Sequence, residues 1–398
     1  MTPDPQPARR PASDAPGQGL RLALFSGNYN YTRDGSNQAL NRLVACLLNM
    51  GAQVRVYSPT TDTPAFQPQG ELVSVPSLSL PGRTDYRLAL GLPWRVRMDL
   101  ERFAPTTVHL SAPDLLGVQA RNFARRRGLP IVASLHTRFE TYLGYYGLDW
   151  LRPSAERYLH RFYAGCDRIL APNAPLADLL AREGLGEKVR VWGRGVDRDQ
   201  FSPARRDLAW RRNLGLADDE VVVAFLGRLV MEKGLDMWAD SLDRLADLPV
   251  RPLIIGDGPA SDGLRERMPG AIFTGLLAGD DLGRAIASSD ILFNPSLTEA
   301  FGNATLEAMA AGLAVVCPSA PSTLTLVDTG KDGLLVDDAT APAFAQAIRT
   351  LVETPMLRLR LGRKARATSE HHGWRESCAS VLEVYRELGA APGTHARS

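Results

Sequence analysis

Several features are scarce or missing in this chain of 398 residues. Its four cysteines, at positions 46, 166, 317 and 378, are widely spaced and form no Cys-x-x-Cys pair. That spacing argues against a disulfide framework and against a cysteine zinc site, and it favours a reducing compartment. There is also no run of about 18 or more apolar residues, so we expect no transmembrane helix and a cytoplasmic protein.

An excess of one charge is missing too. The chain has 46 basic and 44 acidic residues, and its net charge of +2 gives no reason to expect a nucleic-acid partner. Residues 1–19 lack the apolar core of a signal peptide, so we predict a disordered leader. The adjacent acidic pairs Asp218-Asp219, Asp280-Asp281 and Asp337-Asp338 lie near turns or element ends, so we expect no metal and no other cofactor.

The length and the hydrophobic pattern predict two domains of the α/β class. Short apolar strands alternate with helical stretches in both halves of the chain, which indicates two Rossmann-like βαβ domains. We place the N-terminal domain at residues 20–195, a linker at 196–206 and the C-terminal domain at 207–373. A helix at 374–388 and a disordered tail at 389–398 complete the prediction.

The most informative stretch is Glu299-Ala-Phe-Gly-Asn-Ala-Thr-Leu-Glu307, in which two carboxylates flank a Phe-Gly-Asn turn. An apolar strand precedes it, and a short helix and a second strand follow, so the segment predicts one βαβ unit. The loop that leaves a parallel strand lies at the edge where open α/β folds bind ligands. Two acids there suit an elongated, hydroxyl-rich molecule such as a sugar nucleotide. Two glutamates at arbitrary spacing would instead be solvated acids at helix ends.

A second motif, Gly227-Arg228-Leu-Val-Met-Glu-Lys233-Gly234, follows the apolar strand at 221–226. Gly227 permits close approach of a backbone, while Arg228 and Lys233 place two cations beside the start of a helix. We predict that these cations clamp a diphosphate, because contacts to the leaving phosphate strengthen as its charge develops. The structural alternative is an ordinary surface arginine and lysine.

With both motifs in this order, the chain resembles the retaining GT-B glycosyltransferases of family 4 over about residues 20–388. Further matching segments are 255–259 (Ile-Gly-Asp-Gly-Pro), 273–275 (Phe-Thr-Gly), 195–197 (Gly-Val-Asp) and 201–203 (Phe-Ser-Pro). The resemblance implies two facing domains with a cleft between them, a nucleoside diphosphate sugar as donor, and a final helix that crosses back to the first domain.

The resemblance also implies roles for the two motifs. Glu307 would bind the ribose hydroxyls, and Glu299 would hold the donor sugar together with the backbone N–H groups of Phe301, Gly302 and Asn303. An alternative makes Glu299 a covalent nucleophile, as in retaining glycosidases. We disfavour it because retaining members of this fold lack a suitably placed carboxylate. The donor site would further include residues of three glycine-containing loops: Gly227, Gly256, Phe273 and Gly275.

Two more positions are candidates. His136 follows an apolar strand and matches the family position that reaches the donor sugar, although a lone histidine is more often a satisfied core residue. Gly35 precedes a helix predicted from about Asn37, where its backbone N–H group would approach the diphosphate. The alternative for Gly35 is a plain turn with a serine cap at Ser36.

The loop after the first strand bears on stereochemistry. An inverting transferase needs a general base near the acceptor, often a histidine in this loop, and residues 25–36 contain none. We therefore predict retention of the anomeric configuration.

Within the family, three segments look most like the group of sulfolipid synthases and diacylglycerol glycosyltransferases: residues 136–140, 142–150 and 192–197. We predict transfer of a hexose from a UDP-sugar to a lipid hydroxyl such as that of diacylglycerol, giving a glycolipid; only the resemblance at 273–275 points to uracil. Alternatives are a soluble or polyprenyl-linked saccharide acceptor, a sugar-nucleotide epimerase and a non-catalytic nucleotide-sugar binder.

A basic and apolar stretch suggests where a lipid acceptor would be met. Residues 83–103 interleave five arginines with leucines and Trp94, and residues 121–127 add a second basic group. Apolar side chains beside cations suit the cytoplasmic face of an anionic membrane. The alternative is a solvated arginine-rich helix with a buried Trp94, since Pro93 and three acids interrupt the pattern.

Overall fold

The computed structural model describes residues 15–31, 34–80, 83–136, 141 and 143–390. Contacts among residues divide the chain into two compact units. Unit 1 comprises residues 1–135, 159–170 and 378–398, and unit 2 comprises residues 136–158 and 171–377. This division differs from the predicted domains in one respect: residues 136–158 and 171–195 cluster with the second unit.

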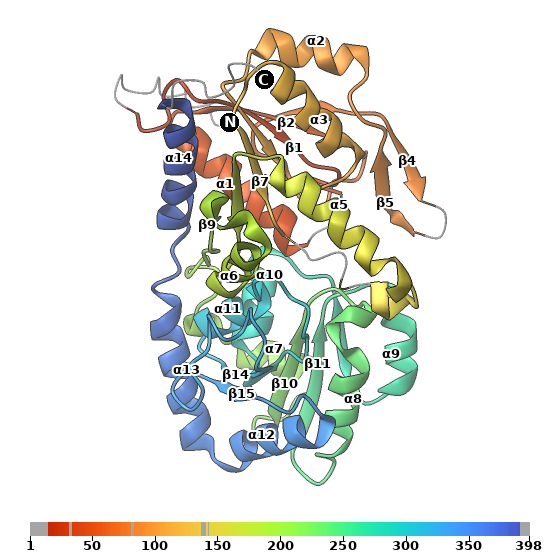
Figure 1. The fold of residues 1–398 in the computed structure, drawn as a ribbon. Coiled ribbons are helices and arrows are strands. Elements are labelled where there is room, and N and C mark those ends of the chain that lie inside the picture. Colours follow the sequence, from red (N-terminus) through yellow and green to blue (C-terminus); the bar gives the residue numbers. More distant parts are fainter. Residues whose placement is uncertain (1–14, 32–33, 81–82, 137–140, 142, 391–398) are drawn as a thin grey trace. The chain divides into compact units, whose positions relative to one another are not determined.

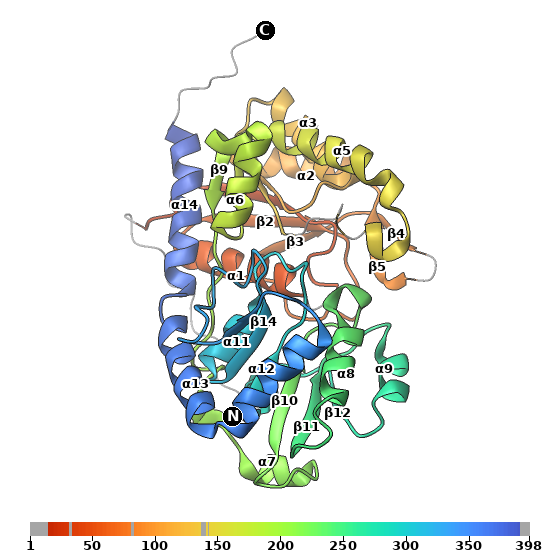
Figure 2. The ribbon, with the colours of Figure 1, turned by 60° about the horizontal axis from the view of Figure 1, so that its bottom comes forward.

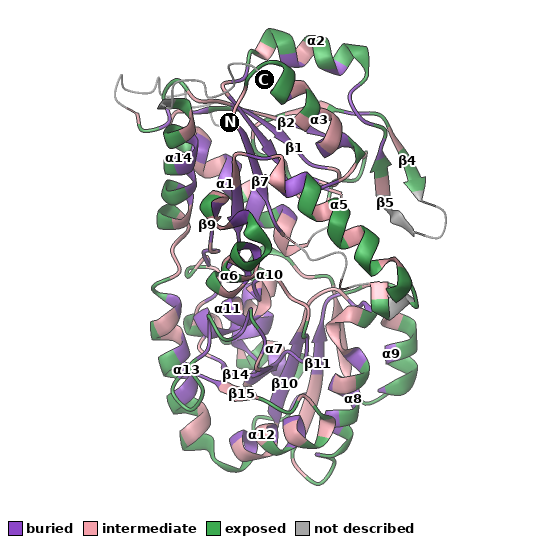
Figure 3. Ribbon diagram, viewed as in Figure 1, coloured by how far each residue is buried: buried purple, intermediate pink, exposed green. Residues whose placement is uncertain are grey.

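Unit 1 is built on parallel strands in the order β3-β2-β1-β6-β7-β8. The central strands are short and rich in apolar residues, and they are buried, as the purple arrows of Figure 3 show. A separate antiparallel pair joins β4 to β5. The strands are β1 (Arg21–Phe25), β2 (Gln53–Ser58), β3 (Glu71–Ser74), β4 (Ser77–Leu80), β5 (Arg83–Ala89), β6 (Thr107–Leu110), β7 (Ile131–Ser134) and β8 (Arg168–Ala171).

Amphipathic helices connect these strands (Figure 1). α1 buries Leu40, Leu43 and Leu47, which are spaced three and four residues apart and therefore lie on one face of the helix. The helices of this half of the chain are α1 (Gly35–Asn49), α2 (Trp94–Phe103), α3 (Leu115–Arg126) and α5 (Arg152–Ala164).

Both chain ends differ from the predicted boundaries. Residues 1–14 of the predicted leader lie outside the described residues, but the turn at residues 16–19 is held by a hydrogen bond from Gly17 N to Met50 O of 2.7 Å. The last helix, α14 (Trp374–Ala390), runs two residues past the predicted 388, and residues 391–398 lie outside the described part. From residue 378 onward α14 belongs to unit 1, where the Tyr385 hydroxyl lies 2.5 Å from Nδ1 of buried His109.

Unit 2 contains a six-stranded parallel sheet in the order β12-β11-β10-β13-β14-β15. Alternate residues of β10 enter two different apolar clusters, so helices cover both faces of the sheet. Figure 2 shows α8 and α12 beside the strands. The strands are β10 (Val221–Leu226), β11 (Val250–Ile255), β12 (Ile272–Gly275), β13 (Ile291–Phe293), β14 (Ala314–Pro318) and β15 (Leu334–Val336).

One face of this sheet packs on α8 and α12 through Trp238 and Phe344, and the other on α10, α11 and α13 through Ile286, Met309 and Ala365. The helices of this half are α6 (Ala174–Leu180), α7 (Leu208–Asn213), α8 (Leu235–Asp243), α9 (Ser261–Arg267), α10 (Gly279–Ala287), α11 (Asn303–Ala310), α12 (Ala341–Glu353) and α13 (Pro355–Ser369), with a π turn at Ala181–Leu185 and a short strand β9 (Val189–Val191). Short 3₁₀ turns are η1 (Leu143–Tyr146), η2 (Asp149–Leu151), η4 (Gly186–Lys188), η5 (Pro203–Arg205) and η6 (Met231–Lys233).

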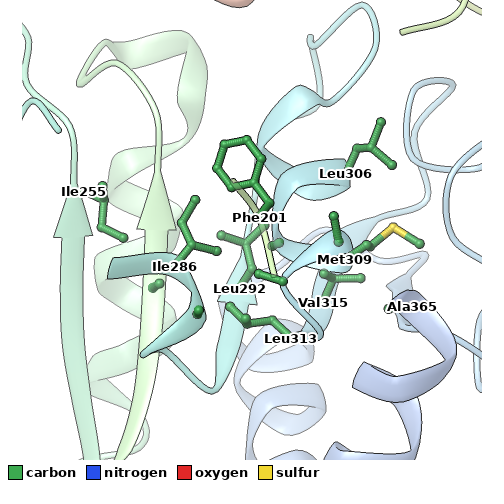
Figure 4. Packing of buried hydrophobic residues seen from close by; sticks show 14 of the residues in the cluster. Phe201, Ile255, Ile286, Leu292, Leu306, Met309, Leu313, Val315 and Ala365 are labelled. Atoms are coloured by element: carbon green, nitrogen blue, oxygen red, sulfur yellow. The ribbon is translucent and has the colours of Figure 1, made fainter. Parts of the chain in front are cut away.

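The predicted linker at 196–206 is folded into the core of unit 2. Val196 and Phe201 are buried, and Figure 4 shows the Phe201 ring among Ile286, Leu292 and Met309. The proline and the charges of this segment suggested a linker, but its two apolar side chains fill the core. None of the helices in the described residues is long and apolar enough to cross a membrane.

Candidate donor-binding site

The order of the strands in unit 2 locates a binding edge. From β10 the chain proceeds outward to β11 and β12 and then returns to β13 on the other side of β10, so the order reverses between β10 and β13. Ligands of open α/β sheets bind beyond the carboxyl ends of the strands at such a reversal. Arg228 and Lys233 follow β10, and Glu299 follows β13. The fold therefore brings the two predicted motifs to one sheet edge.

Lys233 and Glu299 are in direct contact there. Lys233 Nζ lies 2.6 Å from Glu299 Oε1, and the side chain of Glu299 is only 9% exposed. Thr298 Oγ1 donates to the Glu232 carbonyl at 3.2 Å, which ties the two loops together. An ammonium group has three donors, so Lys233 can keep its bond to Glu299 and still donate to a phosphate oxygen. Arg228 lies partly exposed in the same loop.

Glycines allow the neighbouring loops to touch. Gly227 and Gly256 have φ angles of 148° and 145°, and a Cβ atom on Gly256 would lie 1.9 Å from the Gly227 carbonyl oxygen. Gly227 N donates to Ile255 O at 3.1 Å, and Gly256 N donates to Gly275 O at 3.0 Å. The backbones of the predicted residues Gly227, Gly256 and Gly275 thus lie in contact with one another. A side chain at position 256 would prevent this contact.

Phe273 lies on β12, two residues before Gly275, and is partly exposed. The guanidinium of Arg265 lies 4.3 Å from the centroid of its ring, a cation–π contact that covers one ring face. Phe273 also packs against the apolar cluster that covers one face of the sheet.

The start of α11 carries the remaining predicted residues. Gly302, with φ of 94°, precedes Asn303, the first residue of the helix, and a Cβ atom on Gly302 would lie 3.4 Å from Glu299 Oε2. Phe301 is buried, and Glu307 is partly exposed one turn into the helix. The loop is anchored at position 300, where the carbonyl accepts a hydrogen bond of 2.5 Å from Asn173 Nδ2. Sequence reasoning missed Asn173, which follows β8 in a distant part of the chain.

His136 belongs to unit 2 and lies in a cluster of side chains. Arg194 Nη2 lies 2.9 Å from His136 Nδ1, and the guanidinium of Arg194 stacks on Trp192 at 4.0 Å. The rings of His136 and Trp192 meet edge to face at 5.8 Å. Arg194 was not predicted, although its place between two glycines in the Trp192–Asp197 segment was a possible signal. Of the 136–150 segment, residues 137–140 and 142 lie outside the described residues.

Gly35 belongs to unit 1 and differs from its predicted setting. α1 begins at Gly35 itself, and the Asp34 carboxylate accepts a hydrogen bond of 2.8 Å from Asn37 N. The plain-turn alternative required Ser36 to be the helix cap, and it is not. The Ser36 hydroxyl instead donates a hydrogen bond to the Asp34 carboxylate at 2.7 Å. The cap lies one residue before Gly35 because the aspartate outcompetes the serine for the free amides of the first turn.

Sequence reasoning also missed Asp114, at the reversal of strand order in unit 1 between β1 and β6. Its carboxylate caps α3 by accepting from Gly117 N at 2.7 Å, and a Cβ atom on Gly27 would lie 2.0 Å from its Oδ2. Burial raises the pKa of Asp114, and the amide hydrogen bonds oppose that rise only in part. Its signal in the sequence was an aspartate shortly after the strand at 107–110.

The acidic pairs dismissed as metal ligands have other partners. Asp218 pairs with Arg212 at 2.6 Å and Asp280 with Arg205 at 2.8 Å, while Asp337 accepts from Ser319. Within the described residues no group of three histidine, cysteine or acidic side chains is placed to hold a metal ion.

Comparison with known proteins adds to this geometry. Residues 33–200 match the model of Glycosyltransferase Family 4, and residues 220–354 match that of Glycosyl transferases group 1. The chain is 31% identical over 374 residues to the sulfoquinovosyl transferase SQD2 of Arabidopsis thaliana, covering 91% of this chain and 72% of that protein. The chain belongs to glycosyltransferase family 4.

Other similar proteins agree with this assignment. A GDP-mannose-dependent alpha-mannosyltransferase of Mycolicibacterium smegmatis is 33% identical to this family 4 chain, over 93% of this chain and 98% of that protein. Among solved structures, a sucrose-phosphate synthase from Thermosynechococcus elongatus superposes with a TM-score of 0.78 at 19% identity, covering 94% of this chain and all of that one. Anabaena HepE in complex with UDP and glucose gives 0.73 at 18% identity, covering 92% of this chain and all of the other. These structures confirm the predicted GT-B fold.

Proposed function

We propose that this glycosyltransferase moves a hexose from a nucleoside diphosphate sugar to a lipid hydroxyl with retention of anomeric configuration. The observation that carries the proposal is the arrangement at the β10–β13 edge. There Lys233 and Arg228 supply positive charge beside a glycine-lined backbone, and Glu299 lies between Lys233 and the start of α11. Charge on the departing diphosphate increases in the transition state, so cations fixed at this edge stabilise it more than the ground state.

The position of Glu299 supports a role in holding the sugar. Its Oε1 is ion-paired with Lys233 and its carboxylate lies against Gly302, beside the free amides that begin α11. A carboxylate engaged in this way is a weaker nucleophile than an unpaired one, which favours a front-face reaction over a covalent intermediate. Glu307 projects from the same helix and is assigned to the ribose hydroxyls.

We assign the donor a uracil base and treat guanine as the competing candidate. The uracil assignment rests on the resemblance of residues 273–275 to family members. Guanine is the competing base because the relative from Mycolicibacterium smegmatis is named for GDP-mannose. The lipid acceptor rests on the likeness to a sulfoquinovosyl transferase and on the surface of unit 1.

That surface is formed by α2 and the residues just before it, and its exposure is seen as green ribbon in Figure 3. Trp94 is 72% exposed, so the alternative of a buried Trp94 is wrong: the side chain begins the helix on its outer face. The exposed residues that we name the α2 surface are Leu88, Leu90, Trp94, Arg95, Arg97, Met98 and Arg102.

Two of the acids that interrupt the pattern are neutralised by partners. Asp99 pairs with Arg55 at 3.0 Å, and Glu101 pairs with Arg127. In the second basic group, Arg121 donates to the Phe162 carbonyl at 3.1 Å and Arg125 to the Gly165 carbonyl at 3.1 Å. Residues 121–127 therefore support the fold of unit 1, and we limit the proposed contact with anionic membrane to the α2 surface.

The experiment that tests the function is incubation with a panel of nucleotide sugars, with and without membrane lipid and with excess EDTA, followed by mass spectrometry. We expect a nucleoside diphosphate and one new lipid species heavier by a single hexose, formed only when lipid is present and unaffected by EDTA. Conversion of donor without lipid would favour the epimerase. Donor binding without turnover would favour the non-catalytic binder, and loss of turnover with EDTA would contradict metal independence.

A further inference from the structure

The contact between Arg194 and His136 fixes the chemistry of the histidine ring. A guanidinium group has hydrogen-bond donors and no acceptor. Arg194 Nη2 lies 2.9 Å from His136 Nδ1, so Nδ1 must accept and carries no proton. The single ring proton then lies on Nε2, and the imidazole is neutral.

Arg194 is itself held rigidly. It is buried, it stacks on Trp192 at 4.0 Å, and its Nη1 donates to the Trp192 carbonyl at 3.2 Å. The backbone on either side is anchored as well. Ser377 Oγ donates to the Gly193 carbonyl at 2.7 Å, and Val196 N donates to the His372 carbonyl at 3.0 Å. A guanidinium with so little freedom presents its N–H groups in one direction.

The same segment reaches the start of the donor loop. His372 meets the ring of Phe301 edge to face at 6.4 Å, and Phe301 lies two residues after Glu299. A Cβ atom on Gly195 would lie 2.4 Å from the backbone nitrogen of Trp374, so the chain packs closely at the residue that follows Arg194. Within unit 2, His372 therefore connects the Arg194 segment to the loop proposed to hold the sugar, because it accepts from Val196 and contacts Phe301.

We propose that Arg194 is a positioning residue that holds His136 as the neutral Nε2–H tautomer, so that His136 donates a hydrogen bond to an oxygen of the donor sugar. In this form His136 is not a general base, because its unprotonated nitrogen accepts the hydrogen bond from Arg194. The assignment of the sugar as the ligand rests on the proposed transferase function, whereas the tautomer itself does not.

The tautomer is measured directly by two-bond ¹H–¹⁵N correlation NMR on protein labelled with ¹⁵N-histidine. His136 is one of six histidines and is identified by the signal lost in His136→Gln. We expect this ring to show an unprotonated Nδ1 and a proton on Nε2 in the wild-type protein. A ring protonated on Nδ1, or on both nitrogens, would overturn the proposal. This measurement on the wild-type protein needs no variant of Arg194.

The variant Arg194→Met removes the donor and keeps an unbranched side chain in the cavity. In this variant we expect the signals of a single Nε2–H tautomer of His136 to be replaced by those of exchanging tautomers. The control Arg198→Met, at an exposed arginine four residues later, should leave the signals unchanged. Persistence of the signature in folded Arg194→Met overturns the proposal. If circular dichroism shows that this variant does not fold, Arg194→Gln replaces it.

A kinetic cycle separates positioning from general support of the fold. We expect His136→Gln and Arg194→Met each to lower kcat/KM by about 10-fold, the loss typical of one hydrogen bond. The double variant should be no worse than His136→Gln alone, because Arg194 acts through His136. Losses that multiply would overturn the positioning role. Absence of any transferase activity would refute the proposed function while leaving the NMR result to decide on the tautomer.

Discussion

Lys233 is the residue on which the proposed chemistry depends most closely, because it is ion-paired with Glu299 and follows β10 at the reversal of strand order. We predict that Lys233→Ala and Arg228→Ala each lower kcat by about 10² or more without loss of the fold, since their contacts to the diphosphate strengthen as it leaves. Steady-state kinetics measure this effect. Lys331→Ala, which removes an ion-paired but 65% exposed lysine, is the matched control and should leave kcat unchanged. Normal kcat in either site variant would refute the clamp.

Glu307 tests the other half of the site. Glu307→Ala should weaken binding of the free nucleoside diphosphate by about 1.5–3 kcal/mol, the range for hydrogen bonds to a charged group. Titration calorimetry measures this, with Glu353→Ala, an exposed glutamate at the end of α12, as the control. Wild-type affinity in Glu307→Ala would remove Glu307 from the ribose site.

Residue patterns revealed some of this site and not the rest. That Arg228, Lys233 and Glu299 meet at one sheet edge could be predicted, because they stand in loops directly after apolar strands, where the fold class places ligands, and Glu307 stands in the helix that follows. Their roles stay predictions. Arg194 and Asn173 could not be predicted, since each acts on a residue far away in the sequence, and only the folded chain brings the pairs together.

At the scale of elements, the cap of α3 illustrates how burial alters a carboxylate. Burial raises the pKa of Asp114, so its charge lowers the stability of the folded state at neutral pH. Asparagine caps helices about as well as aspartate and carries no charge. We predict that Asp114→Asn raises the melting temperature at about pH 7, and that the difference shrinks as the pH falls through the raised pKa towards the ordinary value of 3.8, where both states bind the proton.

Differential scanning calorimetry over a pH series measures this trend. Asp207→Asn is the control, because Asp207 caps α7 through Trp210 N but its side chain is 37% exposed. A lower melting temperature for Asp114→Asn at neutral pH would show that the charge of Asp114 stabilises the fold.

The α2 surface gives a prediction about membranes. Each basic residue near an anionic surface contributes about 1 kcal/mol, so replacing Trp94, Arg95 and Arg97 by serine should weaken binding to anionic liposomes by about 30-fold or more. Flotation with liposomes of graded anionic content measures this. The matched control replaces an exposed leucine and two exposed arginines of α13: Leu359, Arg360 and Arg363. Liposome binding that does not depend on the anionic lipid content, or an equal loss of binding in both variants, would show that the α2 surface is not the membrane contact.

Elements with a clear period could be predicted, and those without one could not. The strand at 221–226 lies where the apolar pattern predicts it, and the last helix begins at the predicted residue 374. β4 and β5 were missed because residues 77–89 mix leucines with serines and arginines, and their antiparallel pairing, unlike a buried parallel strand, does not demand a continuous apolar run.

At the scale of the whole molecule, hydrophobic periodicity identified two α/β halves but not their exact extent. Segments 136–158 and 171–195 continue the pattern of the first half, yet their contacts cluster with unit 2, and Cys378 onward returns to unit 1. Which unit a connecting segment joins depends on contacts between residues distant in sequence, such as that of Tyr385 with His109, and no local pattern encodes them.

The central claim is that unit 2 binds a nucleoside diphosphate sugar at the β10–β13 edge and transfers the sugar with retention. Time-resolved ¹H NMR of the anomeric proton tests it most directly, with donor, lipid acceptor and either wild-type protein or Lys233→Ala. We predict a product with the same anomeric configuration as the donor, formed in step with free nucleoside diphosphate and slowed by about 10² or more in the variant. An inverted product, or a wild-type rate in Lys233→Ala, would contradict the account.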